Sequence, residues 1–338
     1  MTKLNLTNTQ KIALNLIVED LRFIYSILLF NNSKHTSSFS VALQPYLGLI
    51  TDGIEQWSRK VKPINNYIPK FTDEEKSYYT EMRNSIKMWN NDFHTLNQTL
   101  CSIYVENDTY FSSLCKPIAK KLNLYDIYGC FIVNGFYCDN TILDCLFTPF
   151  FKHGTMDGEY RKSMSIFLGK LVDSFGANEL CPLSVDSKMK FETQDFCGFV
   201  KSPTGYRNYD RTFVLFSLLC TINFLILCVD RYVLDESPTK LRFIYIQYFY
   251  LIHMIQEINS NFNSNFKIND KWYCEKMRNC MAHYGIGSVL CQNEVIANDT
   301  FGGVTYKLFN CDWILLKSNI LSELKDLAKQ LQNYIHIL

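Results

Sequence analysis

The chain has 338 residues, of which 47% are hydrophobic, 15% aromatic and 20% charged. This much apolar surface can bury a full core, which excludes a disordered or low-complexity protein, and the length allows two domains. The 34 basic and 33 acidic residues leave a net charge of +1, so binding to nucleic acid or to an anionic membrane would need a local basic patch.

The first half of the chain is predicted to be helical. Gly and Pro are few (14 and 8), which favours helices over a turn-rich all-β fold. The hydrophobic pattern predicts helices at 9–30, 40–60 and 72–104. Thr72 is followed by three acidic residues, which is typical of a helix start because the hydroxyl can cap the first amides and the acids complement the helix dipole.

A change of pattern divides the chain. Shorter helices are expected up to residue 173, whereas residues 174–205 contain several Pro and Gly residues and show no helical period. We interpret 174–205 as a linker or small β excursion. It separates a helical N-terminal domain at 1–173 from a C-terminal domain at 206–338.

The C-terminal domain carries the sharpest helical pattern. The helices predicted there cover residues 211–232, 239–259, 269–284 and 312–336. Two β-prone runs, 289–296 and 304–309, flank the turn sequence NDTFGG and predict a hairpin before the last helix. The predicted fold is therefore mainly α: a C-terminal four-helix up-and-down bundle with a small β-hairpin, preceded by a helical N-terminal domain.

One segment is apolar enough to raise the question of a membrane span. Residues 212–229 carry no charge and just reach the length that a spanning helix needs. Arg211 and Asp230 bound the segment, and neither an aromatic belt nor a one-sided cluster of Lys and Arg accompanies it. The pattern favours a buried core helix and no membrane contact, with membrane anchoring as the alternative.

The thirteen cysteines include no C-x-x-C pair, which argues against zinc fingers and thioredoxin-type motifs. They are expected to be reduced thiols of a cytoplasmic protein. No cluster of Asp, Glu or His has metal-binding spacing, so we expect neither a metal nor a cofactor.

The third C-terminal helix contains Arg278, Asn279 and His283 in an R-N-x-x-x-H motif. Asn279 and His283 are four residues apart and share a helix face, whereas Arg278 lies about 140° around the helix from His283 and must reach back. A histidine in the last helical turn, where the dipole favours its charged form, can exchange protons with a ribose hydroxyl. An arginine can bind a phosphate through paired hydrogen bonds.

This motif and the helices around it, over about 205–338, resemble the HEPN superfamily (higher eukaryotes and prokaryotes nucleotide-binding domains), many of which are ribonucleases. The resemblance implies a metal-independent endoribonuclease, in which the 2′-hydroxyl of the RNA attacks the adjacent phosphate and leaves a 2′,3′-cyclic end. It also implies a homodimer formed through the C-terminal domain, with two motif helices lining one cleft.

In the layout of its two halves, the chain is similar to HEPN-bearing abortive-infection proteins of antiphage defence, which act as toxins. This similarity implies that the N-terminal domain senses a trigger protein or a nucleotide. Arg278, Asn279 and His283 would be catalytic, with Asn279 orienting the histidine or the helix. Lys276, Lys271 and Tyr284 would contact the RNA.

Two other interpretations of the motif remain open. It could be a structural network in which the arginine pairs an acid and the histidine bonds a carbonyl, or the site of a non-catalytic helical module that binds a nucleotide, RNA or a protein. Residues 66–89 raise a further question, because Arg83 and Asn84 match Arg278 and Asn279 while Met88 occupies the histidine position. They form either a degenerate second copy or an ordinary solvated helix face.

Overall fold

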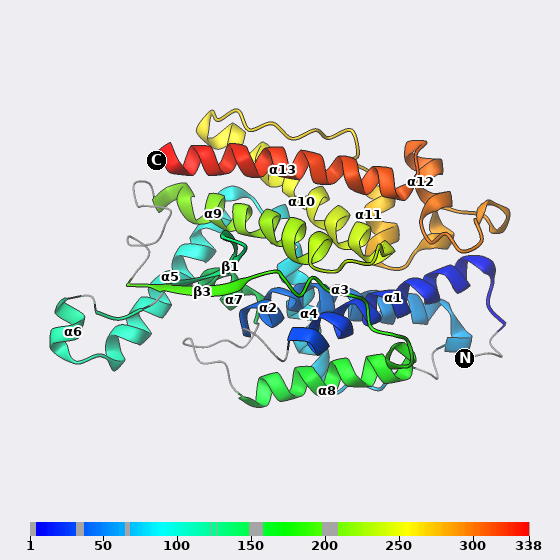
Figure 1. The fold of residues 1–338 in the computed structure, drawn as a ribbon, viewed down its shortest axis with the longest axis horizontal. Helices are drawn as coiled ribbons and strands as arrows, with labels where there is room; N and C mark the ends of the chain where they lie inside the picture. The colour runs from blue at the N-terminus through cyan, green and yellow to red at the C-terminus, as the bar shows by residue number, and fades with distance from the viewer. Residues whose placement is uncertain are drawn as a thin grey trace.

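The computed structural model describes residues 5–31, 37–64, 68–122, 124–126, 128–148, 158–197 and 209–337. The last residues of the predicted linker, 198–205, lie outside these ranges. The architecture is mainly helical, as predicted, and it contains one small three-stranded sheet (Figure 1). In the first half, the elements are α1 (Asn8–Asn31), α2 (Ser37–Ala42), α3 (Gln44–Lys60), α4 (Asp73–Ile86), α5 (Phe93–Leu114), α6 (Pro117–Lys121), β1 (Tyr128–Val133), β2 (Phe136–Asn140), α7 (Thr141–Phe147) and α8 (Gly158–Ser174).

In the second half, the elements are β3 (Phe191–Phe196), α9 (Tyr209–Phe224), α10 (Pro238–Phe262), α11 (Glu275–Ala282), α12 (Gly302–Phe309) and α13 (Trp313–Ile337). Local signals account for several of the helix starts. Thr72 forms a complete capping box with Glu75 at the start of α4, and Pro238 occupies the first turn of α10 behind the capping hydroxyl of Ser237. The predicted helix start at Thr72 is confirmed, as are long helices close to 9–30, 239–259 and 312–336.

The predicted hairpin at 289–309 is wrong, because this segment folds into short helical turns and α12. The Asp299 carboxylate accepts a hydrogen bond from the Gly302 amide at the start of α12, which supplies the partner that a first helical turn lacks. Gly303 lies so close to the Glu294 carbonyl that a side chain would not fit. Capping and tertiary packing override the β propensity of Val304 and its neighbours.

The sheet lies elsewhere, with strand order β2-β1-β3 and antiparallel pairing throughout. The turn between β1 and β2 is Asn134-Gly135, and both residues have positive φ (50° and 83°), as tight hairpin turns require. β3 falls inside the predicted 174–205 segment, so the β excursion is confirmed in part. Its pairing with β1 joins that segment to the first half of the chain.

The buried apolar residues form one cluster that extends from Leu6 to Ile335. α1 packs on α10, α5 on α9 and α3 on α11, so elements of both halves share the core. In Figure 1, α9, α10 and α13 lie in the upper part of the molecule, and α1, α3, α4 and α8 lie below them. The predicted boundary at 174–205 therefore does not divide the core into two.

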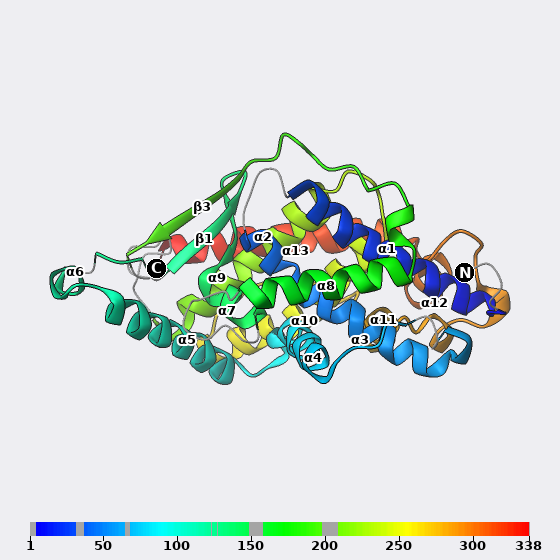
Figure 2. The same ribbon diagram turned by 90° about the horizontal axis from the view of Figure 1, so that it is seen from below.

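α8 runs alongside α1, and the α5–α6 segment projects from one end of the molecule (Figure 2). α9 continues as a π-helical turn over Leu225–Arg231. Within the described ranges, Arg211–Arg231 is the one helix long and apolar enough to cross a membrane, and its apolar window is completely buried in the protein. Such burial is what a core helix of a soluble protein shows.

Candidate functional site

The candidate site lies where α11 ends. His283 is the residue at its C-cap, and Tyr284 follows in the left-handed conformation (φ 51°). The Gly285 amide donates to the Cys280 carbonyl (2.8 Å), which together with the left-handed Tyr284 is the pattern of a Schellman motif. That left-handed position is usually glycine, so a tyrosine there carries backbone strain that the surrounding structure must offset.

A fully buried ion pair holds the strained residue in place. Arg242 of α10 bonds the Asp20 carboxylate of α1 (2.5 Å), and both side chains are completely inaccessible. The Tyr284 hydroxyl donates to the same Asp20 oxygen (2.7 Å), and the Arg242 guanidinium lies 4.3 Å from the Tyr284 ring centre. Arg242 also donates to the Met281 carbonyl (2.7 Å), so this network fixes the last turn of α11 from behind.

α3 packs between this helix end and α4, and two glycines make the close approach possible. A Cβ on Gly53 would lie 2.8 Å from the Ala282 carbonyl oxygen and 2.8 Å from the Tyr284 ring. A Cβ on Gly48 would lie 2.5 Å from the Arg83 backbone nitrogen on α4. Any larger residue would therefore push α3 away from one of its neighbours.

Between these two glycines, Asp52 brings α4 and α11 together. Its Oδ2 atom is 2.6 Å from Arg83 Nε and 3.9 Å from His283 Nδ1. The Gln56 amide donates to the same oxygen (2.8 Å). The side chains of Asp52 and Arg83 are each 17% exposed and that of His283 is 24% exposed, so the imidazole is not sealed inside apolar packing.

Two further cations lie at this site. Arg278 of α11 is half-buried with its guanidinium 5.1 Å from the Phe249 ring centre and 5.9 Å from that of Tyr250. Lys87 follows α4 and is half-buried. Burial lowers the pKa of Lys87, and the charges of Arg83 and Arg278 lower it further.

The charge of the site is therefore unbalanced. Arg83, Lys87 and Arg278 supply three positive charges, and Asp52 supplies one negative charge, which leaves an excess of two. Across the described ranges, no salt bridge is formed by Lys87 or Arg278. An anion is the natural complement of such a group.

The same charges determine the protonation state of His283. Burial lowers its pKa to about 4, Arg83 and Lys87 lower it as well, and Asp52 opposes them in part. The helix dipole is expected to favour the charged form of this histidine, but burial and nearby cations have the larger effect and lower its pKa. At neutral pH the imidazole is uncharged and able to accept a proton.

Two nitrogens of the motif lack hydrogen-bond partners. His283 Nδ1 and Arg278 Nε are both buried without a partner among the described residues. Buried polar atoms are nearly always paired, and exceptions need an explanation. Here both atoms belong to the group with excess positive charge, which is consistent with a site for a polar ligand.

The other sequence-predicted residues lie in different surroundings. Asn279 is exposed, and the described hydrogen bond between it and His283 joins only their backbones. Lys276 and Lys271 are exposed, and the Lys271 ammonium lies 4.5 Å from the Trp272 ring centre. Tyr284 is only 1% exposed, so its predicted contact with RNA is replaced by a structural role in the buried network.

Sequence reasoning missed Asp52 and Lys87, and it left Arg83 undecided. Arg83 and Asn84 match the motif in sequence, and of the two only Asn84 lies on a solvated face. A signal for Asp52 is present in Gly48 and Gly53, because glycines inside a predicted helix indicate close packing on that side. Nothing in the local sequence of Lys87 distinguishes it from other surface lysines.

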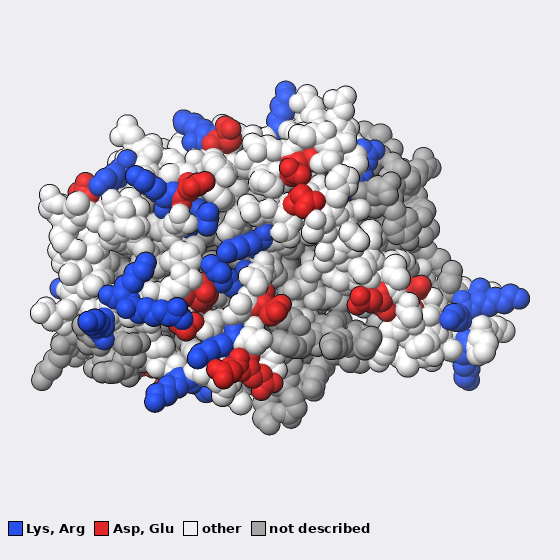
Figure 3. Space-filling view, turned by 180° about the vertical axis from the view of Figure 1, so that it is seen from behind, with Lys and Arg blue, Asp and Glu red and all other residues white. Residues whose placement is uncertain are grey.

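The surface around the molecule is not uniformly basic. On the face shown in Figure 3, basic and acidic side chains are interspersed, and Lys and Arg also gather at the end where α6 projects. The exposed residues of that end include Lys116, Lys120 and Lys121. Binding of a nucleic acid would therefore depend on a local cluster of basic side chains, as the net charge of the chain predicts.

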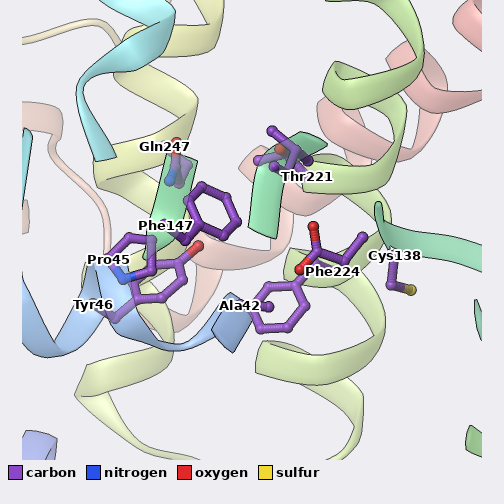
Figure 4. A pocket seen from close by; sticks show the side chains of 10 residues that line it. Ala42, Pro45, Tyr46, Cys138, Phe147, Thr221, Phe224 and Gln247 are labelled. Carbon is purple, nitrogen blue, oxygen red and sulfur yellow. The ribbon is translucent and has the colours of Figure 1, made fainter. Parts of the chain in front are cut away.

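A separate small cavity lies in the core, with Tyr46, Gln247 and Thr221 among its lining residues (Figure 4). It has room for about one water molecule. Asp139 lines it, and burial raises the pKa of its neighbour Asp144 to about 7. No residue of the R-N-x-x-x-H motif lines this cavity.

Across the described part of the chain, no group of three or more His, Cys, Asp or Glu side chains could hold a metal ion. Comparison of the chain with protein-family models, with curated proteins and with solved structures finds no match.

Proposed function

We propose that this protein is a metal-independent endoribonuclease whose reacting groups are His283 and Arg278. The observation that carries the proposal is an uncharged, partly accessible imidazole placed among cations that exceed the nearby carboxylate by two charges. A general base and a positively charged phosphate site are the two elements that RNA cleavage by its own 2′-hydroxyl requires.

In the proposed step, His283 accepts the proton of the ribose 2′-hydroxyl as that oxygen attacks the adjacent phosphorus. The bond from phosphorus to the 5′-oxygen breaks, this oxygen takes a proton from solvent, and His283 returns the proton that it accepted to solvent. The products are a 2′,3′-cyclic phosphate and a 5′-hydroxyl end, so no water is consumed. Arg278 offsets the negative charge that grows on the phosphate oxygens during the attack.

The packing of the C-terminal helices supports the HEPN-like part of the proposal. α13 packs on both α9 and α10, and α11 packs on α10. The motif lies at the end of the short α11, beside the long apolar α10. The proposed biological role, an abortive-infection effector, depends on the family resemblance alone.

The test is RNA cleavage in the presence of EDTA, followed by mapping of the ends. The parent protein should produce 2′,3′-cyclic and 5′-hydroxyl ends, and His283→Ala should lower the rate by about 100- to 10,000-fold, the usual contribution of a general base. Arg278→Ala should lower it by about 100- to 1,000-fold. His94→Ala is the matched control, because His94 is exposed on α5 and bonds only Asn261 among the described side chains.

If His283→Ala cuts RNA as fast as the parent, the assigned site is wrong. A second function is favoured by the His283 pKa of about 4, which leaves the imidazole a weak base and no proton donor at neutral pH. In this second function, Arg83, Lys87 and Arg278 would bind a nucleotide or RNA without cleaving it. Tight binding of RNA by the parent without any cleavage would establish that alternative.

A further inference from the structure

We infer that Arg83 and Lys87 bind a phosphodiester of the RNA opposite Arg278 and His283, so that a single chain completes the phosphate site. The inference extends the proposed function, because it names residues and a substrate contact that the R-N-x-x-x-H motif does not include. It also places α4 of the same chain in the position that the family resemblance gives to a second copy.

Arg83 is the arginine most closely associated with His283. Asp52 links the two side chains, at 2.6 Å from Arg83 Nε and 3.9 Å from His283 Nδ1. Among the motif's own residues, Arg278 extends instead over the Phe249 and Tyr250 rings. The two arginines therefore approach the site from different helices and can contact different oxygens of one phosphate or of two successive phosphates.

The position of Arg83 is fixed by packing as well as by charge. Its backbone nitrogen lies against Gly48 of α3, with no room for a side chain between them. Because Asp52 is on the same helix as Gly48, the backbone contact and the ion pair set the same register between α3 and α4. A guanidinium held in this way loses little freedom when it binds a ligand.

Lys87 lies one helical turn beyond Arg83 on the same face, since the two are four residues apart. It is half-buried, and no carboxylate within the described ranges forms a salt bridge with it. Retaining a desolvated, unpaired ammonium beside two guanidinium groups is unfavourable. A bound phosphodiester would remove part of this cost, and its charge would raise the pKa of His283.

A polynucleotide suits the site better than a free carboxylate, because the excess of two positive charges matches two backbone phosphates. All the participating groups, Arg83, Lys87, Arg278, His283 and Asp52, belong to one chain. A dimer is therefore not needed to assemble this set of groups.

The test uses a short single-stranded DNA, which has the same phosphates but lacks the attacking hydroxyl, so that binding is measured without cleavage. Single-strand affinity falls with salt by a slope of about −0.7 per phosphate contact. Arg83→Gln and Lys87→Gln should each weaken binding and reduce that slope by about 0.7. Arg83→Lys should keep most of the slope, and Lys329→Gln on the exposed face of α13 is the control that should change neither quantity.

Lys87→Gln removes no described ion pair, and circular dichroism checks that both Lys87→Gln and Arg83→Gln remain folded. If both variants bind like the parent, the inference is overturned. Native mass spectrometry with a DNA hexanucleotide tests the single-chain site: one hexanucleotide bound per chain supports it, whereas one hexanucleotide bound per two chains contradicts it. These results are separable from the proposed function, because DNA binding can depend on Arg83 and Lys87 even if RNA is never cleaved.

Discussion

Two arginine environments meet at the end of α11, and they differ in how their charge is balanced. Arg242, behind the helix end, is completely buried, and its charge is balanced by an ion pair with Asp20 and a cation–π contact with the Tyr284 ring. Arg83, in front of it, is partly exposed and belongs to a group whose three cations share one carboxylate. A buried, balanced arginine is typical of structure, whereas a partly exposed and unbalanced group is typical of a binding site.

The comparison predicts opposite consequences for the two arginines. Arg242→Met should lower the free energy of unfolding by about 3–5 kcal/mol, because it leaves the Asp20 carboxyl buried without its partner. Arg83→Gln should cost less, about 1–2 kcal/mol, because the Arg83 and Asp52 side chains are each 17% exposed and Asp52 keeps its hydrogen bond from Gln56, yet it should weaken nucleic-acid binding. Urea unfolding of both variants measures the difference. Equal destabilisation would show that Arg83 is also structural.

The position of α3 between the two environments can be tested with Gly53→Ala. The new methyl group would collide with the Ala282 carbonyl and the Tyr284 ring, which should destabilise the protein by about 1–3 kcal/mol. Gly169→Ala in α8 is the control, because no atom lies within 4 Å of its added Cβ, and it should be neutral or stabilising by up to about 1 kcal/mol. Thermal unfolding compares the two. Similar melting temperatures would contradict the tight contact.

The protonation of His283 tests the electrostatic side of the comparison. With a pKa of about 4 in the folded protein against an ordinary 6.5, the unfolded chain binds the proton first as the pH falls. This group's contribution to stability is therefore complete above 6.5 and is lost as the pH falls from 6.5 through 4.

Arg83→Gln should raise the His283 pKa from about 4 towards 6.5, because it removes a nearby cation while Asp52 remains. NMR titration of the imidazole measures this change, and His94 serves as an internal reference. For cleavage, kcat/KM should rise with pH through the His283 pKa and then stay level up to neutral pH. A pKa that does not respond to Arg83→Gln would place the two side chains too far apart for the proposed site.

The smallest effect on stability is expected for the helix cap at Thr72, which lies far from both arginine environments. Thr72→Ala removes the cap that begins α4, and it should lower the free energy of unfolding by about 1 kcal/mol. Nucleic-acid binding should stay unchanged, because Arg83 and Lys87 lie at the opposite end of that helix. Chemical denaturation and the DNA-binding assay check both statements, and a large loss of binding would show that α4 must be rigid along its whole length.

Much of the helical architecture could be predicted because its signals are local. The Thr72 cap and Pro238 mark helix starts, and the apolar stripe of residues 312–336 indicates the packed face of α13. The prediction of shorter helices between the 72–104 helix and residue 173 is wrong at β1 and β2, although the Asn134-Gly135 turn signal is present in the sequence. At 289–309 the local β preference gave the wrong structure, because capping and close packing outweigh it.

The sequence by itself determined that the chain forms long helices and places an arginine, an asparagine and a histidine near the end of one of them. Only the tertiary structure decided that Tyr284 is buried behind this helix end and that Asp52, Arg83 and Lys87 come to its front. Helix signals depend on neighbours a few residues apart, whereas these positions depend on contacts between α3, α4 and α11 across more than 180 residues of chain. Those contacts depend on the close approach of neighbouring helices at Gly48 and Gly53. In the sequence these glycines indicate close packing, but they do not identify the helices that meet there.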